Sequence, residues 1–428
     1  MNFIGFLKDF VHQPYFGLIL SVLACLCFYI IKSEQATAKK ITWLVYALLF
    51  TITFSIFTGG IFSRLIHPQV YDFTAFYLYG KVAATGHDYY LPGNLHAAFN
   101  MLQLPQLDYA GFQEEIVNVG FLYPPPTILW FAPLGFLSYN TALISWTVFN
   151  LFILLGCIYL IYDLFFKQYK LNGLMLVSIL VFLFLPVRET VSFSQTNFIL
   201  LFFLLLMNKY PDRKFAGILL ALALFTKPYM IVFLFVFILK KQWNTILYFI
   251  MSSLTLVGTT LLLFGKGPFI SYIFSNPSKR LPAWVFSEEI NQSLHGVLLR
   301  NNLITIEDHV SYTCILAGGL LLTAIYLGYL VRRKLYNYLW VALLLTGLLF
   351  YPGTLSYYGV LLLFIMFQFF NSKKSLGLPA NVNIPVVGIF YYLCSVSVFT
   401  CICFLLGIII FKSLKPVTED SVLPLALV

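Results

Sequence analysis

Long apolar runs separated by short polar or basic segments cover most of the chain. The runs have the length of helices and lack the ten-residue alternation of an outer-membrane barrel. Lipid offers the backbone no hydrogen bonds, so spanning segments of this kind form helices. The pattern predicts an all-α, polytopic membrane protein with about twelve transmembrane helices, near residues 15–31, 42–62, 141–162, 172–187, 195–208, 215–226, 228–239, 243–264, 310–331, 338–351, 356–370 and 385–411.

Two features interrupt this regular pattern. The runs 215–226 and 228–239 are shorter than the ~20 residues of a full crossing. We expect a hairpin broken at Lys227-Pro228, because proline removes a donor and disfavours helix at the residue before it. Residues 124–137 are apolar but open with three prolines, which predicts a juxtamembrane or re-entrant helix that does not cross.

Two polar loops, at about 63–140 and 265–309, are too long to be simple connections. We expect both loops on the same side of the membrane, the first of them forming juxtamembrane helices. Together they would build one functional site on a single membrane domain that spans residues 1–428.

The charge pattern predicts which side that is. The chain is 60% hydrophobic and only 10% charged, with a net charge of +10. The short loops 32–40, 163–171, 209–214, 240–242, 332–336 and 371–384 carry a net +12, and the rest of the chain −2. The positive-inside rule assigns these loops to the cytoplasm and the two long loops to the outer face. We expect a bacterial inner (plasma) membrane protein.

Several kinds of chemistry find no support in the sequence. The seven cysteines lie mostly in apolar runs, without metal or disulfide spacing. There is no nucleic-acid patch, phosphate-binding loop, dinucleotide fingerprint, nucleophile elbow or zinc helix. We therefore expect no metal, no cofactor and no nucleic-acid partner. The substrate is expected to be already in the membrane rather than a nucleotide sugar.

Asp72 is the candidate catalytic residue. It opens a helix predicted over 73–84, where it shares one face with Phe76 and Tyr79. Partial desolvation at the headgroup level would raise the pKa of this carboxyl and make it a better base. The alternative is that Asp72 only caps the helix.

Other polar residues of the outer side are candidate ligands. His87 and Asp88 could bind sugar hydroxyls, although Asp88 also suits a turn. Arg188, Gln195 and Asn197 lie at helix ends, where they could face the outer space. Lys227 interrupts an apolar hairpin, and an ammonium at that depth is costly unless it serves a function. Its natural partner is a phosphate, and the alternative is snorkelling to the interface.

The second outer loop and the last outer turn add further candidates. Residues 291–300 form an amphipathic stretch in which Arg300 could meet a phosphate and the other polar residues could bind substrate. The turn at 351–358 brings two tyrosines that could line the same cleft. These additional substrate-binding candidates are Asn291, Gln292, His295, Tyr357 and Tyr358.

The order of these motifs resembles glycosyltransferase family 87, of the C-type membrane superfamily. The resemblance extends over about residues 60–370. The motifs that carry it are Asp72-Phe73, Gly86-His87-Asp88-Tyr89-Tyr90, Tyr123-Pro124-Pro125, Gln195-Thr196-Asn197, Ala216-Gly217 with Lys227-Pro228, and Asn291-Gln292-Ser293-Leu294. Family members often carry histidine in the last outer turn, where this chain has Ser356-Tyr357-Tyr358.

The resemblance implies an inverting hexosyltransferase. It would move a hexose, mannose in polyprenyl-phosphate-mannose-dependent members, from a polyprenyl-phosphate donor to a lipid or glycan acceptor at the outer face. Asp72 matches the general base. Lys227, with Arg188 or Arg300, would stabilise the leaving phosphate.

Two alternatives remain at this point. The chain could be a lipid-linked-glycan flippase or transporter, which predicts charge along a central path. It could also be a glycan polymerase or ligase that uses undecaprenyl-linked substrates, which predicts more outer arginines than the sequence has.

Overall fold

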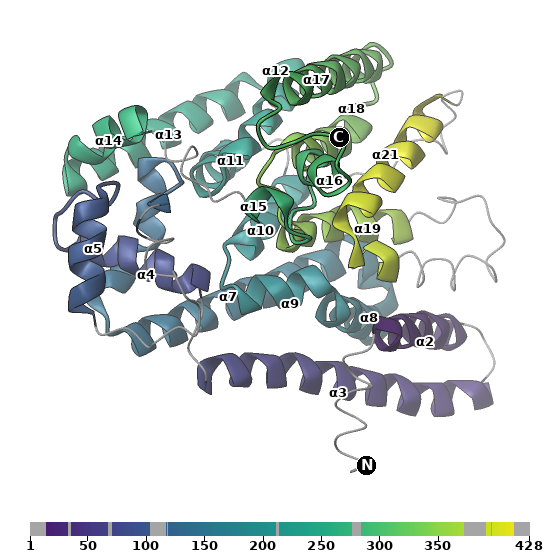
Figure 1. The fold of residues 1–428 in the computed structure, drawn as a ribbon. Coiled ribbons are helices and arrows are strands. Elements are labelled where there is room, and N and C mark those ends of the chain that lie inside the picture. Colours follow the sequence, from purple (N-terminus) through teal and green to yellow (C-terminus); the bar gives the residue numbers. More distant parts are fainter. Residues whose placement is uncertain are drawn as a thin grey trace.

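The computed structural model describes residues 14–32, 36–66, 71–102, 117, 119–210, 214–275, 284–371, 391–394 and 396–414 (Figure 1). These residues are almost entirely helical, which confirms the all-α class. None of them belongs to a β-strand, although one isolated antiparallel bridge joins Asn291 and Leu355.

The helices follow the apolar runs closely. In chain order the α-helices are α2 (Pro14–Lys32), α3 (Ala36–Ile66), α4 (Tyr71–Ala84), α5 (Pro92–Met101), α7 (Tyr139–Ile161), α8 (Lys170–Leu183), α9 (Leu185–Ser192), α10 (Asn197–Lys209), α11 (Lys214–Thr226), α12 (Leu234–Leu239), α13 (Trp243–Phe264), α14 (Gly267–Ser275), α15 (Trp284–Ser287), α16 (Leu294–Arg300), α17 (His309–Arg332), α18 (Tyr336–Phe350), α19 (Leu362–Asn371) and α21 (Val398–Leu414).

Four described stretches are long and apolar enough to cross a membrane. They are Thr42–Phe62, Tyr139–Leu183, Trp243–Phe264 and Val310–Arg332. Seven shorter apolar helices lie at other predicted spans, so the chain is a membrane protein, while the count of twelve crossings stays a prediction. Of the last predicted span, residues 385–390 and residue 395 lie outside the described residues.

Two breaks between helices lie next to a proline. Lys227 has an extended backbone between α11 and the 3₁₀-helix η5 (Pro228–Phe233), which confirms the break at Lys227-Pro228. The predicted span 172–187 differs from expectation, because α8 ends before Phe184 and α9 begins at Leu185. Pro186 then lies in the first turn of α9, where its missing N–H is no loss.

The proline-rich segment forms two 3₁₀-helices, η1 (Pro125–Trp130) and η2 (Ala132–Phe136). Six residues of 3₁₀-helix rise only about 12 Å, and the bilayer core is about 30 Å thick. Neither helix is long enough to cross, in agreement with the prediction for 124–137. Burial of Pro125, Pro126 and Ile128 shows that η1 packs into the protein.

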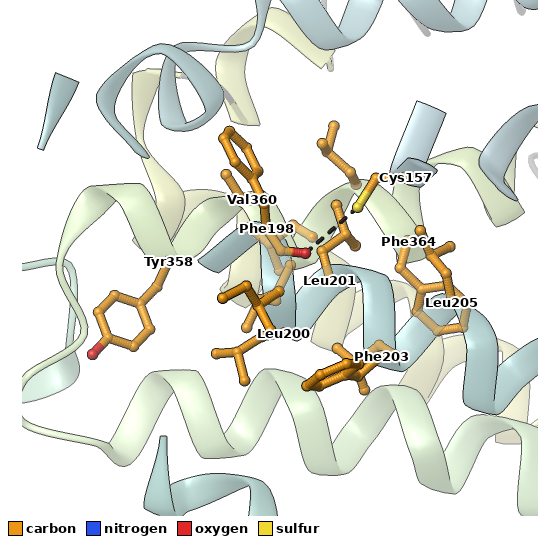
Figure 2. Packing of buried hydrophobic residues seen from close by; sticks show 14 of the residues in the cluster. Cys157, Phe198, Leu200, Leu201, Phe203, Leu205, Tyr358, Val360 and Phe364 are labelled. Carbon is orange, nitrogen blue, oxygen red and sulfur yellow. Dashed lines mark hydrogen bonds between the residues drawn. The ribbon is translucent and has the colours of Figure 1, made fainter. Parts of the chain in front are cut away.

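α10 is buried along most of its length. Its apolar side chains pack against α7, against the 3₁₀-helix η7 (Ser356–Leu361) and against α19, which continues from η7 (Figure 2). The Cys157 thiol of α7 donates to the Phe198 carbonyl at 3.5 Å. Tyr358 stands at the edge of this cluster, and its hydroxyl points away from it.

α4, which carries Asp72, is fixed by backbone contact with η2. A Cβ built at Gly80 would lie 2.2 Å from the Phe131 carbonyl oxygen, and one at Gly135 would lie 2.3 Å from the Gly80 carbonyl oxygen. Only residues without a Cβ allow this approach. Lys81 adds a hydrogen bond to the Gly135 carbonyl at 2.9 Å.

We predict that Gly80→Ala and Gly135→Ala each destabilise the protein by about 1–3 kcal/mol through overpacking. Gly93→Ala in α5 is the matched control, because a Cβ there meets nothing within 4 Å. Thermal unfolding of the purified protein measures the difference. Equal midpoints for the three variants would show that α4 is not held by this contact.

Candidate active site

Asp72 lies in the first turn of α4 and meets the turn that precedes α10. The Gln195 side-chain amide donates to its carboxylate at 2.6 Å. The Gln195 backbone N–H is itself held by the Thr190 carbonyl at 2.9 Å, so the amide approaches from a fixed position. Burial raises the pKa of Asp72 to about 6, and the Gln195 hydrogen bond and the Lys227 charge oppose that rise. The carboxyl is therefore suited to accept a proton near neutral pH.

Lys227 is the most unusual charge of the interior. Only 2% of its surface is exposed. Its ammonium donates to the hydroxyls of Tyr123 at 3.1 Å and Tyr358 at 2.7 Å. The same ammonium lies 4.9 Å and 4.5 Å from the centres of these two rings. Among the described residues it has no carboxylate partner within ion-pair distance, although it interacts electrostatically with Asp72.

Five tyrosines lie near Asp72 and Lys227. We call them the tyrosine cluster, and they are Tyr123, Tyr229, Tyr351, Tyr357 and Tyr358. Their rings meet at centroid distances of 5.4 Å between Tyr357 and Tyr358 and 5.4 Å between Tyr229 and Tyr351. Tyr123 completes the cluster from the long loop at 63–140. Flat aromatic faces with hydroxyls at their edges suit a ligand that has both a polar group and an apolar stem.

Tyr123 is positioned by Phe76 and Tyr79, which were predicted to share one face of α4 with Asp72. Phe76 stacks on Phe131 at 4.4 Å and lies 6.1 Å from the Tyr123 ring. The Tyr79 hydroxyl donates to the Gly120 carbonyl at 3.0 Å. Phe76 and Tyr79 are buried, so these two aromatics hold the loop before η1 rather than contact headgroups.

α9 forms a second polar wall beside η7. The Thr190 hydroxyl and the Asn197 amide both donate to the Tyr357 carbonyl, at 3.2 Å and 3.1 Å. Glu189 lies next to Ser356, and burial raises the pKa of its carboxyl. Burial also lowers the pKa of Arg188. The structure thus brings Gln195, Asn197, Tyr357 and Tyr358 into one region, where Glu189 adds a second carboxyl that was not among the predicted ligands. The roles of these residues and of Arg188 in substrate binding stay predictions.

His87 and Asp88 do not join this group. The Asp88 carboxylate accepts from the Tyr90 backbone N–H at 2.9 Å and from the Ser271 hydroxyl at 2.6 Å. It therefore closes a turn and ties that turn to α14. His87 is exposed and contacts Thr85 at 3.2 Å. The substrate contacts of both residues stay a prediction.

The candidate residues of the second long loop make mostly local bonds. Fully buried Asn291 donates to the carbonyls of Val285 and Pro352 at 2.9 Å and 2.8 Å. Arg300 donates to the carbonyls of Glu288 and Asn291, both at 2.7 Å. These bonds fasten the loop to the turn at 351–355 that leads into the tyrosine cluster.

Gln292 and His295 also make contacts within this part of the fold. The Gln292 backbone N–H donates to Thr354 at 2.7 Å, and its side-chain oxygen accepts from the Phe399 N–H at 3.1 Å. The His295 ring packs between Phe286 and Tyr312. A role in substrate binding stays a prediction for Asn291, Gln292, His295 and Arg300.

A metal centre has no candidate in the described part of the chain. No group of three or more His, Cys, Asp or Glu side chains there is close enough to hold an ion. The site therefore consists of Asp72, its amide partner Gln195, the enclosed ammonium of Lys227 and the tyrosine cluster.

A buried carboxyl and an enclosed ammonium thus lie in one aromatic site of a membrane protein. The sequence model of glycosyltransferase family 87 matches residues 121–356, which is more than half of the chain. The chain belongs to this family, as its motif order predicted, and is a glycosyltransferase. The matched region contains Lys227 and Gln195, whereas Asp72 precedes it. No curated protein and no solved structure matches the chain.

We predict that Asn291→Ala lowers the free energy of unfolding by roughly 2 kcal/mol or more, because two partly buried carbonyls lose their donor. Asn301→Ala is the matched control, since exposed Asn301 makes only a helix-end bond to Val297 at 2.8 Å. Denaturant or thermal unfolding measures both variants. If Asn291→Ala is as stable as the control yet loses activity, Asn291 returns to the group of substrate ligands.

Proposed function

We propose that this protein is an inverting hexosyltransferase that moves a sugar, mannose by the family resemblance, from a polyprenyl-phosphate donor to a lipid or glycan acceptor. The reaction takes place at the outer face of the bacterial inner membrane. The observation that carries the proposal is that the buried Asp72 carboxyl and the enclosed Lys227 ammonium lie in one aromatic site.

Asp72 acts as the general base. It takes the proton from an acceptor hydroxyl as that oxygen forms a bond to the anomeric carbon of the donor sugar. The bond between the anomeric carbon and the phosphate oxygen breaks on the opposite face, and the phosphate leaves with the electron pair. The Gln195 amide donates a hydrogen bond to one carboxylate oxygen of Asp72 and fixes the orientation of the group. The other carboxylate oxygen is then free to take the proton from the hydroxyl of the acceptor substrate.

Lys227 binds the donor phosphate. Its present partners are neutral hydroxyls, so a phosphate oxygen would bring the negative charge that the ammonium lacks. Charge that develops on the leaving phosphate is stabilised most where water is excluded. Arg188 is the second cation near this site, whereas the Arg300 guanidinium is already engaged by two backbone carbonyls.

The arrangement of charges supports an outer-face reaction. α10 begins at Asn197 beside the site and ends at Lys209. Lys209 pairs at 2.8 Å with Asp163, which also pairs at 2.8 Å with Lys167. The site and these lysines of the basic loops thus lie at opposite ends of a helix about 20 Å long. The positive-inside rule assigns the lysines to the cytoplasm.

Neither alternative has comparable support. The family match is to glycosyltransferases and not to transporters. A diphosphate-linked substrate of a polymerase or ligase would need more positive charge than Lys227 and Arg188 supply.

We predict that Asp72→Asn abolishes transfer but keeps donor binding, while Lys227→Met loses donor binding. Loss of a general base costs about 10²–10⁴ in rate. The assay measures transfer from a polyprenyl-phosphate sugar by the purified protein, together with retention of the labelled donor.

Asp308→Asn is the matched control for the first variant. Asp308 caps α17 through a bond to the Ser311 N–H at 3.0 Å, and Asn preserves such a cap. Near-normal turnover by Asp72→Asn would remove Asp72 from the mechanism. Donor retained by Lys227→Met at the wild-type level would remove Lys227 from phosphate binding.

The pH dependence supplies an independent prediction. The base works when deprotonated, so kcat/KM falls as the pH drops below about 6. The Gln195 hydrogen bond lowers the pKa of Asp72, so Gln195→Met moves this acidic limb to higher pH. Gln168→Met, at the far end of the protein, leaves the limb in place. An unshifted limb in Gln195→Met would show that Asp72 is not the titrating group.

A further inference from the structure

The turn that joins α9 to α10 carries Gln195, the partner of Asp72. Ser194 in this turn has φ 54°, in the left-handed region that a residue with a Cβ rarely adopts. Its backbone N–H donates to the Val191 carbonyl at 3.1 Å, and the Gln195 N–H donates to the Thr190 carbonyl at 2.9 Å. This bond pattern is the Schellman ending of a helix, in which glycine is usual at the left-handed position. A serine there is less favourable, so contacts from outside the turn must help to hold it.

Trp146 of α7 makes such a contact. Its indole N–H donates to the Ser194 carbonyl at 2.7 Å, and only 3% of the surface of Trp146 is exposed. The Ser194 carbonyl and the Gln195 N–H belong to the same peptide unit. Because a peptide unit is planar, a hydrogen bond at each of its ends fixes its orientation. Trp146 and the Thr190 carbonyl together therefore set the direction in which the Gln195 side chain leaves the backbone.

The same tryptophan packs towards the helix that carries Asp72. Its ring lies 5.5 Å from the Phe131 ring, which stacks on Phe76 at 4.4 Å. Phe76 lies one turn after Asp72 in α4, so the two residues share one face of that helix. One rigid side chain thus contacts the turn of Gln195 and, through Phe131, the helix of Asp72. The 2.6 Å bond between the Gln195 amide and the Asp72 carboxylate joins these two parts.

We propose that Trp146 is a positioning residue for sugar transfer, whose indole N–H orients the peptide before Gln195 so that the Gln195 amide reaches the Asp72 carboxylate. This role rests on the proposed function, because it requires Asp72 to be the base. Trp146 acts through Gln195 and takes no part in donor binding. Without the indole bond the amide would leave the carboxylate, which would then be less fixed and harder to deprotonate.

Trp146→Phe removes the N–H and keeps an aromatic ring in place. We expect kcat for transfer from a polyprenyl-phosphate sugar to fall about tenfold, because a small displacement near the reacting atoms is costly. The donor KM keeps its wild-type value. The acidic limb of the kcat/KM profile moves to higher pH, because the hydrogen bond that lowers the pKa of Asp72 is weakened. A limb that stays in place overturns the proposal whatever happens to kcat, since lost stability alone lowers activity without moving the limb.

The limb reports this contact specifically, because Trp146 does not titrate. The titratable groups that interact with Asp72 include Lys227, Tyr79, Tyr123 and Tyr357. Trp146→Phe changes none of these groups, so a moved limb arises from the contact with Gln195. Should Trp146→Phe fail to fold, benzothienylalanine at position 146 keeps the shape of the indole and replaces its N–H by sulfur. We expect the same movement of the limb, and its absence overturns the proposal.

Tyr46→Phe is the matched control for lost stability. It also removes a ring donor from a backbone carbonyl, that of Asn172 at 3.0 Å, and this bond joins α3 to the start of α8. We expect a lower thermal midpoint, as for Trp146→Phe, with the acidic limb in place. A limb that moves equally in both variants overturns the proposal, because the shift would then follow from lost stability.

A double variant distinguishes the role of Trp146 from the proposed function. We expect Trp146→Phe added to Gln195→Met to move the limb no further, because Trp146 acts through the Gln195 amide. A further movement overturns the positioning role. A limb that moves in Gln195→Met but not in Trp146→Phe overturns the role of Trp146 alone. An unmoved limb in Gln195→Met, or near-normal turnover by Asp72→Asn, overturns the proposed function and this role with it.

Discussion

The enclosure of one ammonium group in an apolar interior is the constraint on which the site depends. Lys227 reaches that position because Pro228 ends the preceding helix and leaves an extended residue. Its charge is then satisfied by hydroxyls from Tyr123 and Tyr358, which lie 104 and 131 residues away in the chain. A buried ammonium without such donors would be strongly destabilising. The first long loop, the hairpin break and the turn at 351–358 therefore meet at the Lys227 ammonium.

The two long loops mainly support this arrangement. α4 rests on η2 through glycine contacts, and its aromatic face fixes the loop that carries Tyr123. Asn291 and Arg300 bond to carbonyls of the second loop and of the turn at 351–355. Irregular backbone near a membrane must have its polar groups satisfied within the protein. Much of the polar character of these loops meets that need, and this leaves Asp72, Gln195 and Lys227 at the centre.

Local sequence patterns predicted the helices well, but they could not predict contacts between residues far apart in the chain. Helix ends follow from the limits of apolar runs, and the break at Lys227-Pro228 follows from proline chemistry alone. The role of Tyr123 could not be predicted, because its motif equally suits a stiff turn. Asn291 looked like a ligand because polar residues in an outer loop usually are exposed, yet it is fully buried. A supporting side chain can be told from a substrate ligand only by the residues it contacts. Sequence spacing does not reveal contacts between residues about 60 to 160 positions apart.

The closeness of Asp72 to Lys227 has a consequence for the end of the catalytic cycle. In the proposed reaction the pocket begins with one negative and one positive group, and the donor phosphodiester carries one charge. Proton transfer to Asp72 leaves the pocket positive, while the departing phosphate monoester gains up to one further negative charge. The product is then held more tightly than the donor was. Departure of the lipid phosphate is therefore coupled to loss of the proton from Asp72, so turnover is gated by proton release as well as by bond breaking.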